Sequence, residues 1–114
     1  MSESERVIKM RVAFKLNVKF EYKDEYIKRH NPIWAELEET LFQQGVITYS
    51  IFLEEKTGDL FGYAEIKSLA LWNKIAESTV CQKWWTYMAP LMQTNSDHSP
   101  TTQDLAEVFH IRKP

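Results

Sequence analysis

His30 is the residue whose type and position best suit proton transfer. It lies in the stretch Tyr22–Trp34, directly before an Asn-Pro step and four residues after Tyr26. If this stretch is helical, Tyr26 and His30 share a face, with Cβ atoms about 5–6 Å apart. An unperturbed histidine has a pKa of about 6.5, which suits general acid–base catalysis. The spacing also fits a surface or capping histidine. The direction of its pKa shift stays open. The carbonyl groups at the end of the first helix favour the charged imidazolium, whereas the N-terminus of the next helix favours the neutral imidazole.

Three aromatic residues are candidates for binding a ligand. Trp84 and Trp85 are adjacent, and consecutive helical residues point about 100° apart, so one can pack inward while the other lines a cavity. Indole faces beside polar groups suit the apolar C–H face of a pyranose ring, and they suit a core or a subunit interface equally well. Tyr49 alternates with Ile47 and Ile51, and a buried phenol needs a hydrogen-bond partner, most simply a structural one.

Other kinds of chemistry have little support. The three histidines and Cys81 lack the spacing of a metal-ligand set, so we expect no metal. Only three glycines are present, and the sequence contains no phosphate-binding loop, nucleophile elbow or redox pair. We therefore expect no cofactor.

Composition and charge are those of an ordinary soluble protein. The 114 residues are 44% hydrophobic and 26% charged, with a formal net charge of −2. Acidic and basic residues are well mixed, which argues against nucleic acid or a membrane as a partner. The start lacks an apolar signal core, no segment suits a membrane span, and Cys81 is the sole cysteine. We expect a cytoplasmic protein with one domain at residues 1–114, of which residues 1–6 are a polar extension.

Strands are predicted from alternation of apolar and polar residues. This alternation is clear at residues 8–18, 46–53 and 60–66, and Gly58 supplies the turn between the last two. The tail LAEVFHI, residues 105–111, predicts a last short strand.

Helices are predicted between these strands. A helical pattern runs from Lys23 to Phe42 in two pieces that meet at His30–Asn31, with Asn31 as N-cap and Pro32 as first residue of the second piece. Gly45 ends that piece. Two further helices follow, and we expect Ser68 and Thr79 to cap them and Pro90 to end the second. A polar loop at residues 93–104 comes next, and a loop this long is often functional or mobile.

The order β, α, β, β, α, β predicts an α+β, ferredoxin-like fold, with helices on one face of a four-stranded antiparallel sheet. The other face of such a sheet is usually polar. Here it carries Phe52, Phe61 and Tyr63. Since exposed aromatic surface of this kind needs a cover, we expect a homodimer.

The segments EYIKRHNPIWAELE and TVCQKWWTYM together resemble the bacterial L-rhamnose mutarotase family. The similarity runs over nearly the whole chain, from the first strand to LAEVF. It implies a dimeric ferredoxin-like α+β barrel with an isomerase activity: interconversion of the α and β anomers of L-rhamnose without a cofactor. It places His30 as the proton donor, and as sugar-binding residues it places Tyr26, Tyr49, Trp84 and Trp85.

The chemistry of mutarotation agrees with these residues. Opening and reclosing a hemiacetal requires one proton delivered to the ring oxygen and one removed from the anomeric hydroxyl, so an acid and a base suffice. The base stays open: a tyrosine, a carboxylate, a water or His30 itself. Two other functions also stay open, a non-catalytic ligand-binding or interaction module with the same dimeric fold, and a mutarotase for another 6-deoxy sugar.

Overall fold

The structure is a computed structural model that describes residues 10–114. The expected polar extension at residues 1–6 and the start of the first predicted strand lie outside the described residues. The elements are β1 (Met10–Asn17), α1 (Lys23–Arg29), α2 (Ala35–Gln43), β2 (Val46–Leu53), β3 (Asp59–Ile66), α3 (Leu69–Lys74), α4 (Thr79–Met88) and β4 (Gln103–Leu105). Short 3₁₀ helices lie at Phe20–Tyr22, Ile75–Glu77 and Ala89–Leu91.

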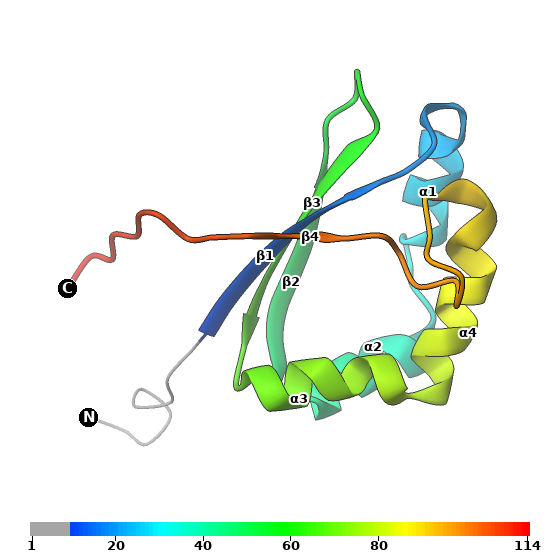
Figure 1. Ribbon diagram of the computed structural model, residues 1–114. Coiled ribbons are helices and arrows are strands. Elements are labelled where there is room, and N and C mark those ends of the chain that lie inside the picture. The colour runs from blue at the N-terminus through cyan, green and yellow to red at the C-terminus, as the bar shows by residue number, and fades with distance from the viewer. Residues whose placement is uncertain (1–9) are drawn as a thin grey trace.

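The four strands form one antiparallel sheet in the order β2-β3-β1-β4, and the helices lie to one side of it (Figure 1). This is the ferredoxin-like arrangement predicted from the order of elements. Figure 1 also shows α1 and α4 standing opposite the sheet, while α2 and α3 lie across one end. The sheet and helices therefore surround a space on three sides.

The sheet face that looks into this space is apolar because three strands contribute alternate residues to it. Phe14 of β1 lies opposite Gly62 of β3, and Tyr49 of β2 lies opposite Ala64. A Cβ atom at position 62 would overlap the Phe14 ring, so only glycine allows the ring to lie against the strand. Gly62 thus determines where Phe14 sits in the cavity wall.

The alternation in β2 is broken at its start. Val46 pairs with Ile66, but Thr48 pairs with the preceding residue of β3, so the register shifts by one residue. Val46 is consequently buried and Ile47 exposed, although strict alternation predicts Ile47 on the face of Tyr49. A β-bulge of this kind leaves no clear signal in the hydrophobic pattern.

Two predicted helix starts were wrong, the first by three residues and the second by one. The second helical piece begins at Ala35, because the Asn31 amide donates a hydrogen bond to the Ile27 carbonyl and so caps the end of α1. The N-cap of α4 is Ser78, whose hydroxyl accepts a hydrogen bond from the Cys81 backbone amide; Thr79 is the first helical residue. The cap predicted at Ser68 and the turn predicted at Gly58, which has a positive φ, are confirmed. Gly45, which follows the end of α2 as predicted, also has a positive φ.

The last predicted strand was also misplaced. β4 pairs with only three residues of β1, and it shares only Leu105 with the predicted range 105–111. Beyond it, Glu107 binds Arg11 through a side-chain ion pair of 2.9 Å, and the backbone makes no further ladder with β1. Val108 is 92% exposed. Its side chain therefore contributes no burial that would hold the tail in the sheet.

The outer sheet face is partly apolar. Phe52 is 62% exposed, Phe61 and Leu105 are also exposed, and Tyr63 is half-buried. Phe52 and Phe61 are direct cross-strand partners, so they form one continuous aromatic surface. In residues 10–114 no helix has the length and apolar character that crossing a membrane would require.

Candidate functional site

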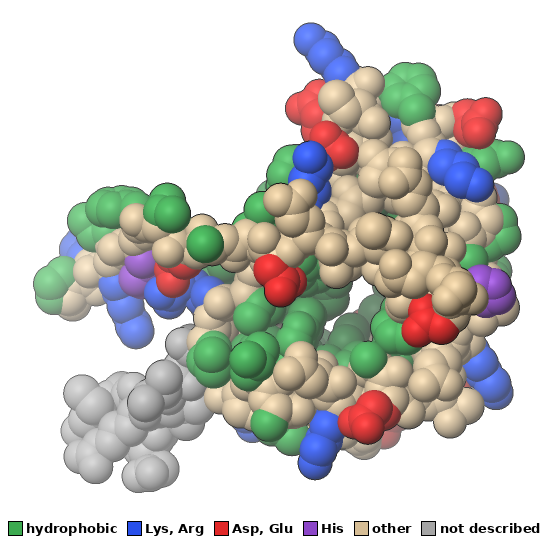
Figure 2. All heavy atoms as spheres, viewed as in Figure 1, with side chains coloured by type: hydrophobic (Ala, Val, Ile, Leu, Met, Phe, Trp, Pro, Cys, Tyr) green, Lys and Arg blue, Asp and Glu red, His purple; other side chains and the backbone are tan. Residues whose placement is uncertain are grey.

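A cavity of about 1020 Å³ lies between the sheet and the helices. Figure 2 shows hydrophobic side chains inside the hollow that opens on this face. The cavity wall includes all five residues that the sequence analysis singled out: Tyr26, His30, Tyr49, Trp84 and Trp85. Residues from α1, β2 and α4 thus meet in one place, and the space is large enough for a monosaccharide.

His30 follows the last residue of α1, where the helix ends before Pro32. Its Nδ1 lies 2.9 Å from the Tyr26 carbonyl oxygen. A carbonyl only accepts hydrogen bonds, so Nδ1 carries the proton and donates it. Nε2 is then the ring nitrogen available to a ligand. The ring is held further by stacking on Tyr26 at 4.2 Å and by an edge contact with Trp84 at 5.2 Å between centroids.

The pKa of His30 lies below the usual value, which settles the direction that the sequence left open. Burial is the main cause, because it disfavours the charged imidazolium, and the hydrogen bond to the Tyr26 carbonyl opposes it in part. The resting side chain at neutral pH is therefore the neutral imidazole, with a lone pair on Nε2.

Tyr26 and Tyr49 both line the cavity, and no described residue hydrogen-bonds to either hydroxyl. The structural partner expected for Tyr49 is thus not found within residues 10–114. Burial raises the pKa of both phenols, and each lies near another titratable group, Tyr26 near Tyr49 and Tyr49 near Cys81. Both side chains stay neutral and can donate a hydrogen bond to a ligand oxygen. Burial also raises the pKa of the Cys81 thiol to about 11, so that residue is no nucleophile.

The two tryptophans have different surroundings. Trp84 is 8% exposed and packs edge-on against Trp34, with 5.0 Å between ring centroids, and against Tyr87. Trp85 is half-buried and packs against the core from the cavity side. Trp84 therefore belongs mainly to the packing behind His30, while Trp85 has more ring surface available to a ligand.

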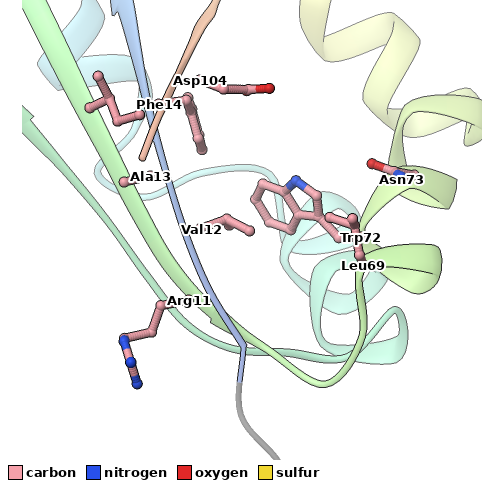
Figure 3. A pocket seen from close by; sticks show the side chains of 9 residues that line it. Arg11, Val12, Ala13, Phe14, Leu69, Trp72, Asn73 and Asp104 are labelled. Carbon is pink, nitrogen blue, oxygen red and sulfur yellow. The ribbon is translucent and has the colours of Figure 1, made fainter. Parts of the chain in front are cut away.

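Sequence reasoning missed Phe14 and Trp72, which complete the aromatic wall around Tyr49. Their ring centroids lie 6.1 Å and 5.7 Å from that of Tyr49. Figure 3 shows Trp72 reaching from α3 toward Phe14 beside a second, smaller cavity of about 230 Å³. The one available signal was Gly62, because a glycine inside a strand often marks a close approach by a neighbouring side chain.

The predicted polar loop contributes residues to the cavity wall. Asn95 closes a tight turn by accepting a backbone hydrogen bond from His98 and donating one to Ser99. His98 has a φ of 71° and lies 3.4 Å from the Thr86 hydroxyl of α4. Hydrogen bonds thus hold the loop to itself and to α4, and the loop adds polar groups to a cavity lined largely by apolar side chains.

Together these groups can exchange one proton with a small ligand at Nε2 of His30, donate hydrogen bonds from two neutral phenols, and cover an apolar ligand face with indole rings. A polyhydroxylated ring with one apolar face has the matching properties.

Comparison with known proteins shows similarity to one family over most of the chain. The sequence model of the family described as L-rhamnose mutarotase matches residues 11–111. The L-rhamnose mutarotase of Listeria monocytogenes is 52% identical over 89 residues, covering 78% of this chain and 86% of the relative. That of Oceanobacillus iheyensis is 50% identical over 101 residues, covering 89% and 97%. The crystal structure of the L-rhamnose mutarotase of Formosa agariphila has a TM-score of 0.83 at 37% identity, over 90% of this chain and 99% of that one.

Proposed function

Because the chain belongs to the L-rhamnose mutarotase family, we propose that it interconverts the α and β anomers of L-rhamnose by moving a proton through His30. The observation that carries the proposed site is the hydrogen bond from Nδ1 of His30 to the Tyr26 carbonyl, because it leaves Nε2 as the exchanging nitrogen. The resemblance gives sugar-binding roles to Tyr26, Tyr49, Trp84 and Trp85, and all four line the cavity. Of the two tryptophans, Trp85 has more ring surface available to a sugar, while the buried Trp84 mainly packs behind His30.

The reaction can be written with His30 as both base and acid. As neutral imidazole, Nε2 takes the proton of the anomeric hydroxyl. As imidazolium, it donates that proton to the ring oxygen, the bond from the anomeric carbon to the ring oxygen breaks, and the open-chain aldehyde forms. Both oxygens are bonded to the same carbon, so one nitrogen reaches both. Reclosure on the other face of the carbonyl reverses these two transfers. His30 is thus a proton donor, as the resemblance implies, and it also fills the role of the base.

The two tyrosines and Trp85 would hold the sugar during these transfers. Neutral phenols at Tyr26 and Tyr49 can donate hydrogen bonds to sugar oxygens, and such bonds strengthen as negative charge develops on them. Trp85 would cover the apolar face of the ring. The reaction is an isomerisation of a carbohydrate. We place it in the racemase and epimerase class and the protein in the cytoplasm, in agreement with its single cysteine.

The catalysed rate should fall in acid. The pKa of His30 is lowered, so the imidazole is neutral at pH 7 and takes up its proton only below about pH 6.5. Since the neutral form starts the reaction, the rate should be level near neutrality and drop as the pH falls through that pKa. Exchange rates between pH 4.5 and 8, corrected for the spontaneous reaction, measure this. A rate that rises toward acid would show that imidazolium starts the reaction.

Saturation-transfer NMR of the two anomers tests the function itself. Protein should accelerate exchange of L-rhamnose, and the acceleration should saturate with sugar. Binding without acceleration would favour a non-catalytic module. The same measurement on L-fucose and L-mannose tests whether another sugar is the better substrate.

We propose that the chain forms a homodimer in which a second copy covers the outer sheet face. Sedimentation at micromolar concentration should show a particle of twice the 13.5 kDa chain mass. Phe52→Glu should weaken the dimer, because it places a charge in the apolar surface made with Phe61. Phe20→Glu is the matched control, since Phe20 is similarly exposed but lies outside the sheet. A wild-type protein that sediments only as a monomer would contradict the proposal.

A further inference from the structure

Arg29, the last residue of α1, makes three contacts that the proposed chemistry does not use. Its Nη1 donates a hydrogen bond of 2.7 Å to the Tyr87 carbonyl, in the last turn of α4. Its guanidinium also lies over the Tyr87 ring, 4.1 Å from the centroid, and its Nε lies 3.1 Å from Glu25. The side chain is only 20% exposed. A long cationic side chain is thus immobilised beside His30.

These contacts connect Arg29 to its neighbour in sequence, His30, through residues of α4. Arg29 holds Tyr87, the Tyr87 ring packs against Trp84, and Trp84 contacts the His30 ring edge-on. Within residues 10–114, the bond from Arg29 to Tyr87 is the only hydrogen bond between α1 and α4. α1 has seven residues, too few to be stable without such tertiary contacts.

We infer that Arg29 is a positioning residue, which holds Nε2 of His30 at the cavity by fastening the end of α1 to the last turn of α4. The inference rests on the proposed function. Arginine suits the role because its planar guanidinium can stack on the Tyr87 ring and at the same time donate a hydrogen bond, in its own plane, to the Tyr87 carbonyl. A lysine ammonium at this site would keep the charge but lose this combined geometry. Arg29 itself need not touch the sugar.

The test compares Arg29→Met and Arg29→Lys with the control Glu25→Gln. Arg29→Met should lower kcat by about 10- to 100-fold, because small displacements of a catalytic group are costly, while KM stays within about threefold. Arg29→Lys should recover only part of that loss. Glu25→Gln removes the other partner of the same guanidinium and leaves both Tyr87 contacts, so kcat should stay within about twofold of wild type.

The NMR signals of the His30 ring protons provide a readout independent of activity. Tyr26 stacks on that ring and Trp84 meets its edge, so ring currents make the shifts sensitive to its position. Both Arg29 variants should move these signals in the folded protein, and Glu25→Gln should not. Unmoved signals, or an Arg29→Met kcat within about twofold of wild type, would overturn the inference and leave the proposed function standing. Moved signals in the Arg29 variants, together with a wild-type protein that does not accelerate anomer exchange, would support positioning and reject the function.

Discussion

Replacing His30 should slow anomer exchange by about 10²- to 10⁴-fold, equivalent to about 3–5 kcal/mol of activation free energy. The reason is that Nε2 is the group that both takes and returns the proton in the proposed reaction. His30→Asn should be nearly as slow as His30→Ala, because an amide keeps polarity and approximate size but cannot exchange a proton at neutral pH. Forward and reverse rates should fall equally and leave the anomer ratio unchanged.

The experiment has a matched control in the tail of the chain. His110→Asn removes an exposed histidine whose Nδ1 lies 3.9 Å from the Glu107 carboxylate, outside the cavity wall, and it should leave the rate unchanged. The fold of the His30 variants is checked by thermal unfolding. A folded His30→Asn protein that exchanges anomers within about threefold of wild type would mean that the histidine only binds or caps. The proton transfer would then have to be assigned to Tyr26 or Tyr49.

Replacing the two tryptophans one at a time should separate binding from folding. Trp85→Ala should weaken L-rhamnose binding by about 10- to 150-fold, because it removes the ring surface that covers the sugar, worth about 1.5–3 kcal/mol. Trp84→Ala should instead lower the free energy of unfolding by about 3–5 kcal/mol, because Trp84 is buried among Trp34, Tyr87 and His30.

Two measurements distinguish these outcomes. Intrinsic fluorescence titrated with L-rhamnose gives the Kd, and urea denaturation gives the free energy of unfolding. Wild-type affinity in a folded Trp85→Ala protein would rule out Trp85 as the stacking surface. An unchanged unfolding free energy in Trp84→Ala would mean that Trp84 is a binding residue rather than part of the packing.

The strands of the sheet were predictable from the sequence because one face of the sheet lines the cavity and the other faces outward. Apolar and polar residues therefore alternate along each strand with a period of two. Residues 46–53 are β2 as predicted, and β3 begins one residue earlier than expected. The turn at Gly58 followed from the need for a positive φ, which the structure shows. The order of elements then restricted the topology to the ferredoxin-like arrangement.

The details that failed depend on contacts between distant parts of the chain. Asn31 caps the preceding helix rather than the next, and that choice depends on where Pro32 directs the chain. Phe14 and Trp72 reach Tyr49 only because three elements fold over one cavity. Spacing placed Tyr26 beside His30, but it could not show that Nδ1 donates to a carbonyl, which orients the imidazole.

The burial of His30 also connects proton uptake to folding. In the unfolded chain the imidazole would take up a proton near pH 6.5, whereas in the folded protein its pKa is lower. As the pH falls through 6.5, the unfolded state binds the proton first, so mass action shifts the equilibrium toward it. This effect grows until the folded-state pKa is passed and then levels off. The environment that keeps Nε2 unprotonated for proton exchange at neutral pH therefore makes this histidine a source of acid sensitivity in the native state.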